Sequence, residues 1–306
     1  MAEPVELHSI KPPAKIVVVG LGAMGIPMAK RLKEAGYDVI GIDLAPASRK
    51  AFEDQVGPAF APGTDAVRGA SAVITMLPNG KIVREALCGA DGIAQKLAAN
   101  TLIIDMSSSA PTDTVALDKE LAAIGLALID APVSGGVRRA IDGTLAIMAG
   151  GPAAQVERAR PVLEAMGKSV FGTGPIGSGH AMKALNNYVS AAGLVAAAEA
   201  LLVGRNFGLQ PETIVDVLNA SSGRNNSTEV KMKQFIIPET YGSGFALALM
   251  AKDLRIAADL AKHLRLDPLQ IGPTADLWEE ARDQLAAGAD HTEIYRFVAE
   301  RTADKK

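Results

Sequence analysis

The chain has 306 residues, of which 48% are hydrophobic and 21% charged, a size that fits one large or two ordinary domains. Its 31 basic and 34 acidic side chains leave a formal charge of −3, and only 4% of residues are aromatic, which argues against a nucleic-acid partner. The single cysteine, Cys88, excludes an intramolecular disulfide and a cysteine-cluster metal site. Without an apolar leader segment near the start, we expect a cytoplasmic protein with no membrane partner.

Short β-branched segments alternate with helical patterns through the first half of the chain. The predicted strands cover residues 15–19, 38–43, 72–76, 102–105, 126–130, 145–149 and 169–171. The predicted helices between them cover residues 24–35, 81–87, 111–124 and 153–166. Because apolar strands that alternate with helices are typical of a parallel sheet covered on both faces, we expect an α/β domain with a mostly parallel sheet over residues 1–174.

The pattern changes at the Gly- and Pro-rich segment GTGPIGSG, which predicts a loop. A long helix rich in Ala and Leu is predicted over residues 180–206, followed by helices over 211–219, 245–263 and 274–286. The longest apolar run, residues 188–203, is shorter than the roughly 20 residues that span a bilayer, so we expect this helix to be buried by protein, including a partner subunit. Residues 175–306 are therefore predicted to form an all-α domain that one long interdomain helix opens.

The strongest local signal is a glycine-rich loop between the first strand and the first helix: Gly20, Leu21, Gly22, Ala23, Met24 and Gly25. Its glycines suit a tight turn, a close approach of the backbone to a pyrophosphate, and close packing of helix on strand. The phosphate would then rest on N–H groups at the start of the helix. The combination predicts dinucleotide binding in preference to a plain glycine-rich turn.

Asp43 ends the next strand, at the spacing expected for a carboxylate that holds the adenosine ribose hydroxyls. A carboxylate there would repel a 2′-phosphate, and the adjacent Leu44 brings no cation, so NAD is favoured over NADP. Arg49 and Lys50 would soften this preference if they faced the ribose, but we expect them on a solvated helix face.

Two further segments follow predicted strands at the carboxyl edge of the sheet, where open parallel sheets bind ligands. The first holds Leu77 and Pro78, and the second holds Ser107, Ser108 and Ser109 before Pro111. Locally, the serines are equally consistent with an ordinary helix N-cap.

A third segment contains Ser134, Gly135 and Gly136. A hydroxyl beside two glycines can present successive N–H groups to a carboxylate, although the tripeptide alone is also consistent with a simple β-turn.

Lys183 and Asn187 lie four residues apart on the predicted long helix and so share one face. Apolar neighbours predict little solvent around Lys183, and burial beside a cationic nicotinamide would lower its pKa toward the range useful for proton transfer. His180 is a rival acid–base group, but we expect it to cap the end of the loop. The other histidines are scattered, so no metal site is predicted.

Several long segments together resemble the β-hydroxyacid dehydrogenases, a family that includes 3-hydroxyisobutyrate dehydrogenase and tartronate semialdehyde reductase. They occur in order over most of the chain: GLGAMGIPMAKRL, DMSSSAP, DAPVSGGVRRAIDGTLAIMAGG, GPIGSGHAMKALNN and LMAKDLRIA. The resemblance implies a Rossmann-type domain, a long interdomain helix, a helical C-terminal domain, and assembly as a homodimer or homotetramer.

The resemblance also assigns roles to individual residues. It places the catalytic lysine at Lys183, its companion at Asn187, and the substrate carboxylate on Ser134, Gly135 and Gly136. Cofactor contacts would fall on the glycine-rich loop and on a set of further residues: Asp43, Leu44, Leu77, Pro78, Ser108 and Lys252. Position 108 is often Thr in relatives, and Ser keeps the hydroxyl.

These features predict reversible, NAD-dependent oxidation of a small 3-hydroxy acid to its semialdehyde or ketone, as in 3-hydroxyisobutyrate dehydrogenase. Polar residues after Arg224 leave tartronate semialdehyde, sulfolactaldehyde or a threonate-like substrate open, and Arg224 is equally consistent with binding a second anion or with a salt bridge. A non-catalytic dinucleotide-binding reader is an alternative of another class, and an imine reductase is a nearer one; the presence of Lys183 argues against both.

Overall fold

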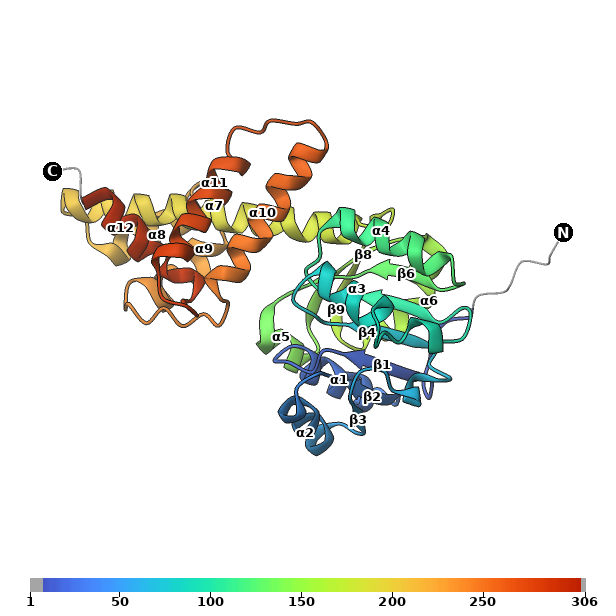
Figure 1. Cartoon of the computed structure of the whole chain (residues 1–306). Helices are drawn as coiled ribbons and strands as arrows, with labels where there is room; N and C mark the ends of the chain where they lie inside the picture. Colours follow the sequence, from blue (N-terminus) through green and yellow to red (C-terminus); the bar gives the residue numbers. More distant parts are fainter. Residues whose placement is uncertain (1–7, 304–306) are drawn as a thin grey trace. The chain divides into compact units, whose positions relative to one another are not determined.

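The computed structural model describes residues 8–303, and the chain forms two compact units, Met1–Lys183 and Ala184–Lys306. The first unit is built on a nine-stranded sheet with the order β3-β2-β1-β4-β5-β6-β8-β7, and β9 pairs with β8 (Figure 1). Its strands are β1 (Lys15–Val19), β2 (Asp38–Ile42), β3 (Ala59–Phe60), β4 (Ala72–Thr75), β5 (Leu102–Asp105), β6 (Ala127–Asp130), β7 (Val133–Ser134), β8 (Leu145–Gly150) and β9 (Gly167–Gly174).

Strands β3, β2, β1, β4, β5 and β6 run parallel, and β8 joins β6 in the antiparallel sense. The helices of this unit are α1 (Gly25–Glu34), α2 (Pro46–Gln55), α3 (Gly80–Cys88), α4 (Pro111–Ala122), α5 (Gly136–Asp142) and α6 (Ala153–Glu164). Every strand predicted from the sequence is present, and the predicted α/β class with a mostly parallel sheet is confirmed. The prediction missed β3, β7, α2 and α5.

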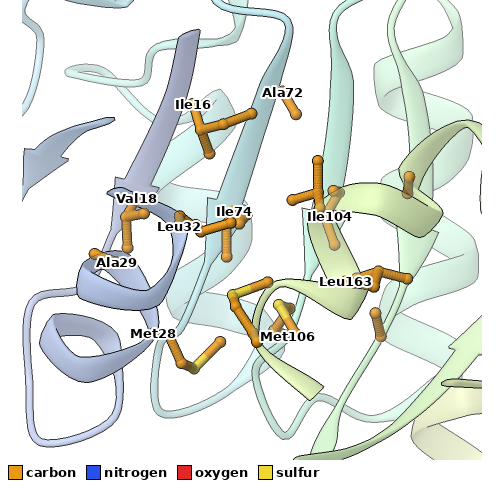
Figure 2. Close-up of a cluster of buried hydrophobic side chains, with 14 of the residues drawn as sticks. Ile16, Val18, Met28, Ala29, Leu32, Ala72, Ile74, Ile104, Met106 and Leu163 are labelled. Atoms are coloured by element: carbon orange, nitrogen blue, oxygen red, sulfur yellow. The ribbon is translucent and has the colours of Figure 1, made fainter. Parts of the chain in front are cut away.

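Alternate residues of β1 face two different cores, which is why the strand is apolar throughout. Ile16 and Val18 lie in one core with helices α1 and α6, whereas Val17 and Val19 lie in the other with α3 and α4. Figure 2 shows the first of these cores, where Met28 and Leu32 of α1 gather with side chains of β1, β4 and β5. Helices on both faces leave only the ends of the strands for ligands.

Strand order reverses between β1 and β4, because the chain passes from β1 outward to β2 and β3 and then returns to β4. In open α/β sheets the crevice at the carboxyl ends of the strands beside such a reversal is the usual place for a ligand. Gly20 follows β1 and Met76 follows β4, so the glycine-rich loop lies at this position.

The second unit is helical, and the helix α7 (Ser178–Phe207) passes from the first unit into it without a break. The other elements are α8 (Pro211–Ala220), α9 (Asn226–Val230), a π-helical turn η3 (Met232–Ile236), α10 (Leu247–His263), α11 (Ile271–Gln284), a 3₁₀ turn η4 (His291–Glu293) and α12 (Ile294–Ala303). Their core surrounds Trp278 and includes Leu194 and Leu201 of α7. The sequence predicted α7, α8, α10 and α11, but not α9 or α12.

Helix α7 has 30 residues, and within residues 8–303 it is the one helix that is long and apolar enough to cross a membrane. The sequence analysis compared only the apolar run 188–203 with the thickness of a bilayer, whereas the whole helix is long enough to span one. Core helices of soluble proteins pass the same test, and α7 carries residues of the helical core just described.

Candidate active site

The loop after β1 has the geometry that a pyrophosphate needs. Gly20 has φ +97°, and a Cβ there would lie 2.3 Å from the Met76 carbonyl oxygen. A Cβ on Gly25 would lie 1.9 Å from the Gly20 carbonyl oxygen, so both positions require glycine for close packing. A Cβ on Gly22 would meet no atom within 4 Å in the described structure, which leaves room beside the loop for a ligand.

Helix α1 starts at this loop, and its N-cap residue Met24 makes no side-chain capping bond within the described chain. N–H groups in the first turn of a helix have no intrahelical acceptor, and the helix dipole favours an anion beside them. The uncapped start of α1, together with the open space at Gly22, therefore fits a dinucleotide phosphate.

Asp43 directly follows β2 and is tied to the glycine-rich loop. Its Oδ2 accepts from the Leu21 N–H at 2.8 Å, and its Oδ1 accepts from the Ala45 N–H at 2.8 Å. These bonds orient the carboxylate and leave lone pairs for ribose hydroxyls. Leu44 is exposed beside it.

Arg49 was expected on a solvated helix face, and this expectation is wrong. Its Nη1 donates to the carbonyl oxygens of Asp43 at 2.8 Å and of Leu44 at 2.9 Å, which places a cation next to the proposed ribose site. Lys50 does lie on the exposed face, where it pairs with Asp54.

The serines after β5 do not cap α4, because the N-cap residue of that helix is Ala110 and makes no side-chain capping bond in the described region. Instead, the Ser107 hydroxyl accepts from the Leu77 N–H at 2.9 Å, and the Ser109 hydroxyl donates to Asp105 Oδ2 at 3.0 Å. Ser107 and Ser109 are buried and join the ends of β4 and β5, while Ser108 between them is only partly buried.

Asp130, at the end of β6, holds the start of α7. Its Oδ1 accepts from the Gly177 N–H at 2.7 Å, and its Oδ2 accepts from the His180 N–H at 2.8 Å. Asp130 is fully buried, so this carboxylate acts as a cap supplied from the sheet. The sequence reading missed it, although two strand-end aspartates, Asp105 and Asp130, stand opposite each other in the register.

His180 is not a loop-end cap. Its ring is buried, with Nδ1 2.8 Å from the Thr114 hydroxyl and Nε2 3.1 Å from the Ser107 carbonyl oxygen. The ring therefore connects α7 to the start of α4 and to the serine segment. This use of both ring nitrogens in the first unit makes it a structural residue rather than a rival acid–base group.

Ser134 ends β7, and α5 begins two residues later at Gly136. Gly135 has φ +133° and Gly136 has φ +67°, backbone conformations that other residues rarely adopt. Both glycines are exposed, and a Cβ on Gly136 would meet nothing within 4 Å in the described structure. The turn thus presents its backbone to solvent, as a seat for a carboxylate requires.

Lys183 and Asn187 lie on the continuous helix α7, one turn apart and on one face. Lys183 is partly buried, whereas the sequence predicted a more enclosed side chain. Asn187 is buried, and its Nδ2 donates to Asp253 Oδ2 at 2.6 Å. Asp253 Oδ1 lies 3.2 Å from the Lys252 ammonium, so a buried carboxylate holds the Asn187 amide in one orientation.

The predicted residues thus form two groups. In the first unit, hydrogen bonds join the glycine-rich loop to Asp43 and Leu77 to Ser107. In the second unit, Asn187 and Lys252 meet through Asp253. Asp253 was missed, although it directly follows Lys252 in the segment LMAKDL.

Comparison with known proteins extends these observations over most of the chain. A family described as the NAD binding domain of 6-phosphogluconate dehydrogenase matches residues 15–174. A second family, described as the NAD-binding of NADP-dependent 3-hydroxyisobutyrate dehydrogenase, matches residues 177–298.

Among curated relatives, the chain is 39% identical over 248 residues to 2-(hydroxymethyl)glutarate dehydrogenase of Eubacterium barkeri, an alignment that covers 81% of this chain and 82% of the relative. It is 40% identical over 248 residues to a 3-hydroxyisobutyrate dehydrogenase of Pseudomonas aeruginosa, with 79% and 83% covered. A solved structure of Mycobacterium tuberculosis 3-hydroxyisobutyrate dehydrogenase matches with a TM-score of 0.86 and 33% identity, covering 93% of this chain and 99% of that one.

The sheet, the glycine-rich loop and the helical second unit define a dinucleotide-dependent dehydrogenase. The matches to both halves of the chain and to full-length relatives agree with this class. The chain belongs to the β-hydroxyacid dehydrogenase family, and it is an NAD-dependent dehydrogenase of hydroxy acids. The predicted family and cofactor are confirmed.

Proposed function

We propose that this enzyme reversibly oxidises a small 3-hydroxy acid to its semialdehyde or ketone, with Lys183 as the general acid and base. The observation that carries the proposal is the shared face of α7, on which Lys183 lies one turn from an Asn187 amide oriented by Asp253. The exposed turn of Ser134, Gly135 and Gly136 would hold the substrate carboxylate.

Bound NAD supplies the hydride acceptor. In oxidation, the neutral amine of Lys183 removes the hydroxyl proton of the substrate as the carbon–oxygen double bond forms. In reduction, the Lys183 ammonium returns a proton to the carbonyl oxygen. Asn187 would position either the lysine or the substrate oxygen. The Ser134 turn would hold the substrate so that its reacting carbon stays aligned with the side chains of Lys183 and Asn187.

The cofactor would lie along the carboxyl edge of the sheet, on the loop from Gly20 to Gly25. Further cofactor contacts are proposed for six residues: Asp43, Leu44, Leu77, Pro78, Ser108 and Lys252. The carboxylate of Asp43, held by the Leu21 N–H, supports NAD over NADP, and the nearby Arg49 moderates that preference.

Replacing Asp43 by alanine is expected to weaken NADH binding about 10- to 100-fold, because a charge-assisted hydrogen bond contributes about 1.5–3 kcal/mol. NADPH should lose less, since the repulsion of its 2′-phosphate disappears at the same time. Fluorescence titration of both reduced dinucleotides measures the change. Asp54→Ala, on the exposed face of α2, serves as the matched control. An unaltered ratio of the two affinities in Asp43→Ala would contradict the assignment.

The reaction itself is tested by following NADH absorbance with purified enzyme and a panel of substrates. The panel contains 3-hydroxyisobutyrate, tartronate semialdehyde, sulfolactaldehyde, threonate, 2-(hydroxymethyl)glutarate and a cyclic imine. We expect turnover of a hydroxy acid or its carbonyl product, and none of the imine. NADH binding without turnover of any member would instead support a dinucleotide-binding reader.

We also propose a soluble, cytoplasmic homodimer or homotetramer. Two exposed apolar side chains near the end of α7, Val203 and Phe207, support a subunit contact there, because such side chains on a helical face favour association. The proposed functional boundary lies at residues 174 and 175, slightly before the division of the two compact units at Lys183. The proposed homodimer or homotetramer is tested by light scattering on the purified protein, which measures the oligomeric state.

A further inference from the structure

Arg49, near the start of α2, is a cation with a fixed position and unused hydrogen-bond donors. It is half-buried, and its Nη1 group donates to the carbonyl oxygens of Asp43 at 2.8 Å and of Leu44 at 2.9 Å. A guanidinium has five N–H groups, and Nη1 carries two of them. Within residues 8–303, the Nε and Nη2 groups of Arg49 have no hydrogen-bond partner. Donors of a positioned cation therefore remain for a ligand.

In the described part of the chain, no carboxylate lies at ion-pair distance from Arg49. Glu53, four residues further along α2, has the usual spacing for a helical ion pair but does not reach the guanidinium. Asp54 pairs with Lys50 instead. The Asp43 carboxylate accepts from two backbone N–H groups and not from Arg49. The positive charge is thus not neutralised by a neighbour in the first unit.

The unused Nε and Nη2 groups form one edge of the planar guanidinium, and this edge can donate two parallel bonds to an oxyanion. Arg282 uses the same edge to bind Asp283, with Nε 2.8 Å and Nη2 3.1 Å from the two carboxylate oxygens. The corresponding edge of Arg49 has no such partner among the described residues, so it is available to an anion that offers two or more oxygens.

The position of this edge suits the additional phosphate of NADP. The proposed function places the adenosine ribose at the Asp43 carboxylate, whose Oδ2 accepts from the Leu21 N–H at 2.8 Å. Arg49 is anchored on the main-chain carbonyl oxygen of the same residue, at 2.8 Å. In NADP the phosphate is carried by the 2′-oxygen of the ribose, which is the oxygen that such a carboxylate holds in NAD. The 2′-phosphate would therefore lie within reach of the guanidinium.

Asp43 alone would disfavour NADP, because its negative charge repels the 2′-phosphate. Arg49 brings the opposite charge to the same loop, so the repulsion is offset at short range, where salt screens charges little. The unmodified ribose of NAD gains nothing comparable from Arg49, since its hydroxyls carry no charge. The loop after β2 thus contains one group that selects NAD and a second that admits NADP.

We propose that Arg49 forms a binding site for the 2′-phosphate of NADP, and that the enzyme uses NADP as a second cofactor beside NAD. The proposal rests on the proposed function, because that function places the adenosine ribose at Asp43. All residues of this site belong to the first unit. The two cofactors should respond differently to replacement of Arg49, and this difference is what the experiments measure.

The first test is fluorescence titration of NADH and NADPH with the wild type and Arg49→Gln. We expect the dissociation constant of NADPH to rise about 10- to 100-fold in the variant, because a charge-assisted contact with two bonds is lost. The dissociation constant of NADH should change less than about threefold, since the variant keeps a polar side chain beside the loop. An equal rise for both dinucleotides, or no rise for NADPH, overturns the proposal.

Two further variants separate the guanidinium edge from charge alone. Arg49→Lys keeps the charge but cannot form two parallel bonds, so its NADPH affinity should lie between those of the wild type and Arg49→Gln. Lys50→Gln is the matched control, because this adjacent cation lies on the exposed face of α2 and pairs with Asp54. The control should leave both dinucleotides unaffected. A loss of NADPH binding in Lys50→Gln as large as in Arg49→Gln overturns the assignment to Arg49.

Nucleotide fragments test the site apart from the nicotinamide and from turnover. Calorimetric titration compares adenosine 2′,5′-bisphosphate with adenosine 5′-phosphate, which lacks only the 2′-phosphate. Arg49→Gln should weaken binding of the bisphosphate about 10- to 100-fold and leave that of the monophosphate nearly unchanged. The same ratio of affinities in the wild type and the variant overturns the proposal.

Turnover is then measured with NAD and NADP on a hydroxy acid that the wild type oxidises. The wild type should use both cofactors, and Arg49→Gln should lose kcat/KM for NADP about 10- to 100-fold while keeping that for NAD within about threefold. No turnover with NADP by the wild type overturns its use as a cofactor. If no hydroxy acid is oxidised with either cofactor, the proposed reaction fails, and the fragment titration still decides the 2′-phosphate site.

Discussion

Replacing Lys183 by alanine is expected to lower kcat about 100- to 10,000-fold, the range that a positioned general acid–base group contributes. The side chain would no longer exchange a proton with the substrate oxygen, and water would have to serve instead. NADH affinity should change little, because the proposed phosphate and ribose contacts lie on the loops after β1 and β2. Stopped-flow measurement of the chemical step, combined with fluorescence titration of NADH, separates the two effects.

A primary amine added in solution offers a sharper readout for this residue. If Lys183 transfers the proton, methylamine should restore part of the activity of Lys183→Ala, and the recovered rate should rise with the concentration of the protonated amine in the reductive direction. Lys262→Ala, an exposed position on α10, is the control and should behave as the wild type does. Unchanged kcat in Lys183→Ala, or loss of NADH binding together with kcat, would contradict the assignment.

The second large effect is expected for Asp130→Asn. The substitution removes a buried carboxylate that accepts from two N–H groups at the start of α7, and an amide group in its place would direct a donor toward one of them. A buried N–H group left without its acceptor costs about 1–3 kcal/mol of stability. Lys183 lies three residues beyond His180 on the same helix, so we also expect kcat to fall roughly 10- to 100-fold through misplacement of the lysine.

Urea unfolding followed by circular dichroism measures the stability change, and steady-state kinetics with saturating NADH measures the rate. Asp142→Asn provides the comparison, because that carboxylate is exposed at the end of α5 and should change stability by less than about 0.5 kcal/mol. A variant at position 130 as stable as the wild type would show that the two N–H groups find another acceptor.

The elements that the sequence predicted well are those with strong local patterns. Strand β1 is apolar at consecutive positions, and α7 combines length with a high content of Ala and Leu, so neighbours in the chain specify both. The two-residue strands β3 and β7 have too few residues to show a period, and they form only because an adjacent strand supplies their hydrogen bonds.

The site residues also divide into those with a local sequence pattern and those that depend on distant partners. The glycine-rich loop is visible from its spacing, because Gly20 and Gly25 each meet a local steric requirement. Asp130 bonds to N–H groups 47 and 50 residues further along the chain, and Asp253 bonds to a residue 66 positions before it. Such partnerships depend on tertiary structure, so a single sequence carries no signal for them apart from the aspartates themselves.

Arg224 was equally consistent, from the sequence, with binding a second anion and with a salt bridge. In the structure the exposed arginine lies 3.7 Å from the Glu229 carboxylate, and the polar residue after it, Asn225, starts α9 with a capping box, so the salt bridge is the alternative observed. Lys231, with a less conspicuous sequence context, is the cation that is buried. The sequence shows the charge of both side chains, but burial follows from packing between helices and is visible only in the structure.

The continuity of α7 limits how this protein could evolve. Lys183 and Asn187 owe their alignment to a fixed count of intervening residues, and each inserted or deleted residue would rotate everything beyond it by about 100°. A one-residue indel between them would separate the two side chains at once. Adaptation to longer or shorter substrates must therefore come from exchanging side chains on the elements around the helix, while the number of residues in the helix stays fixed.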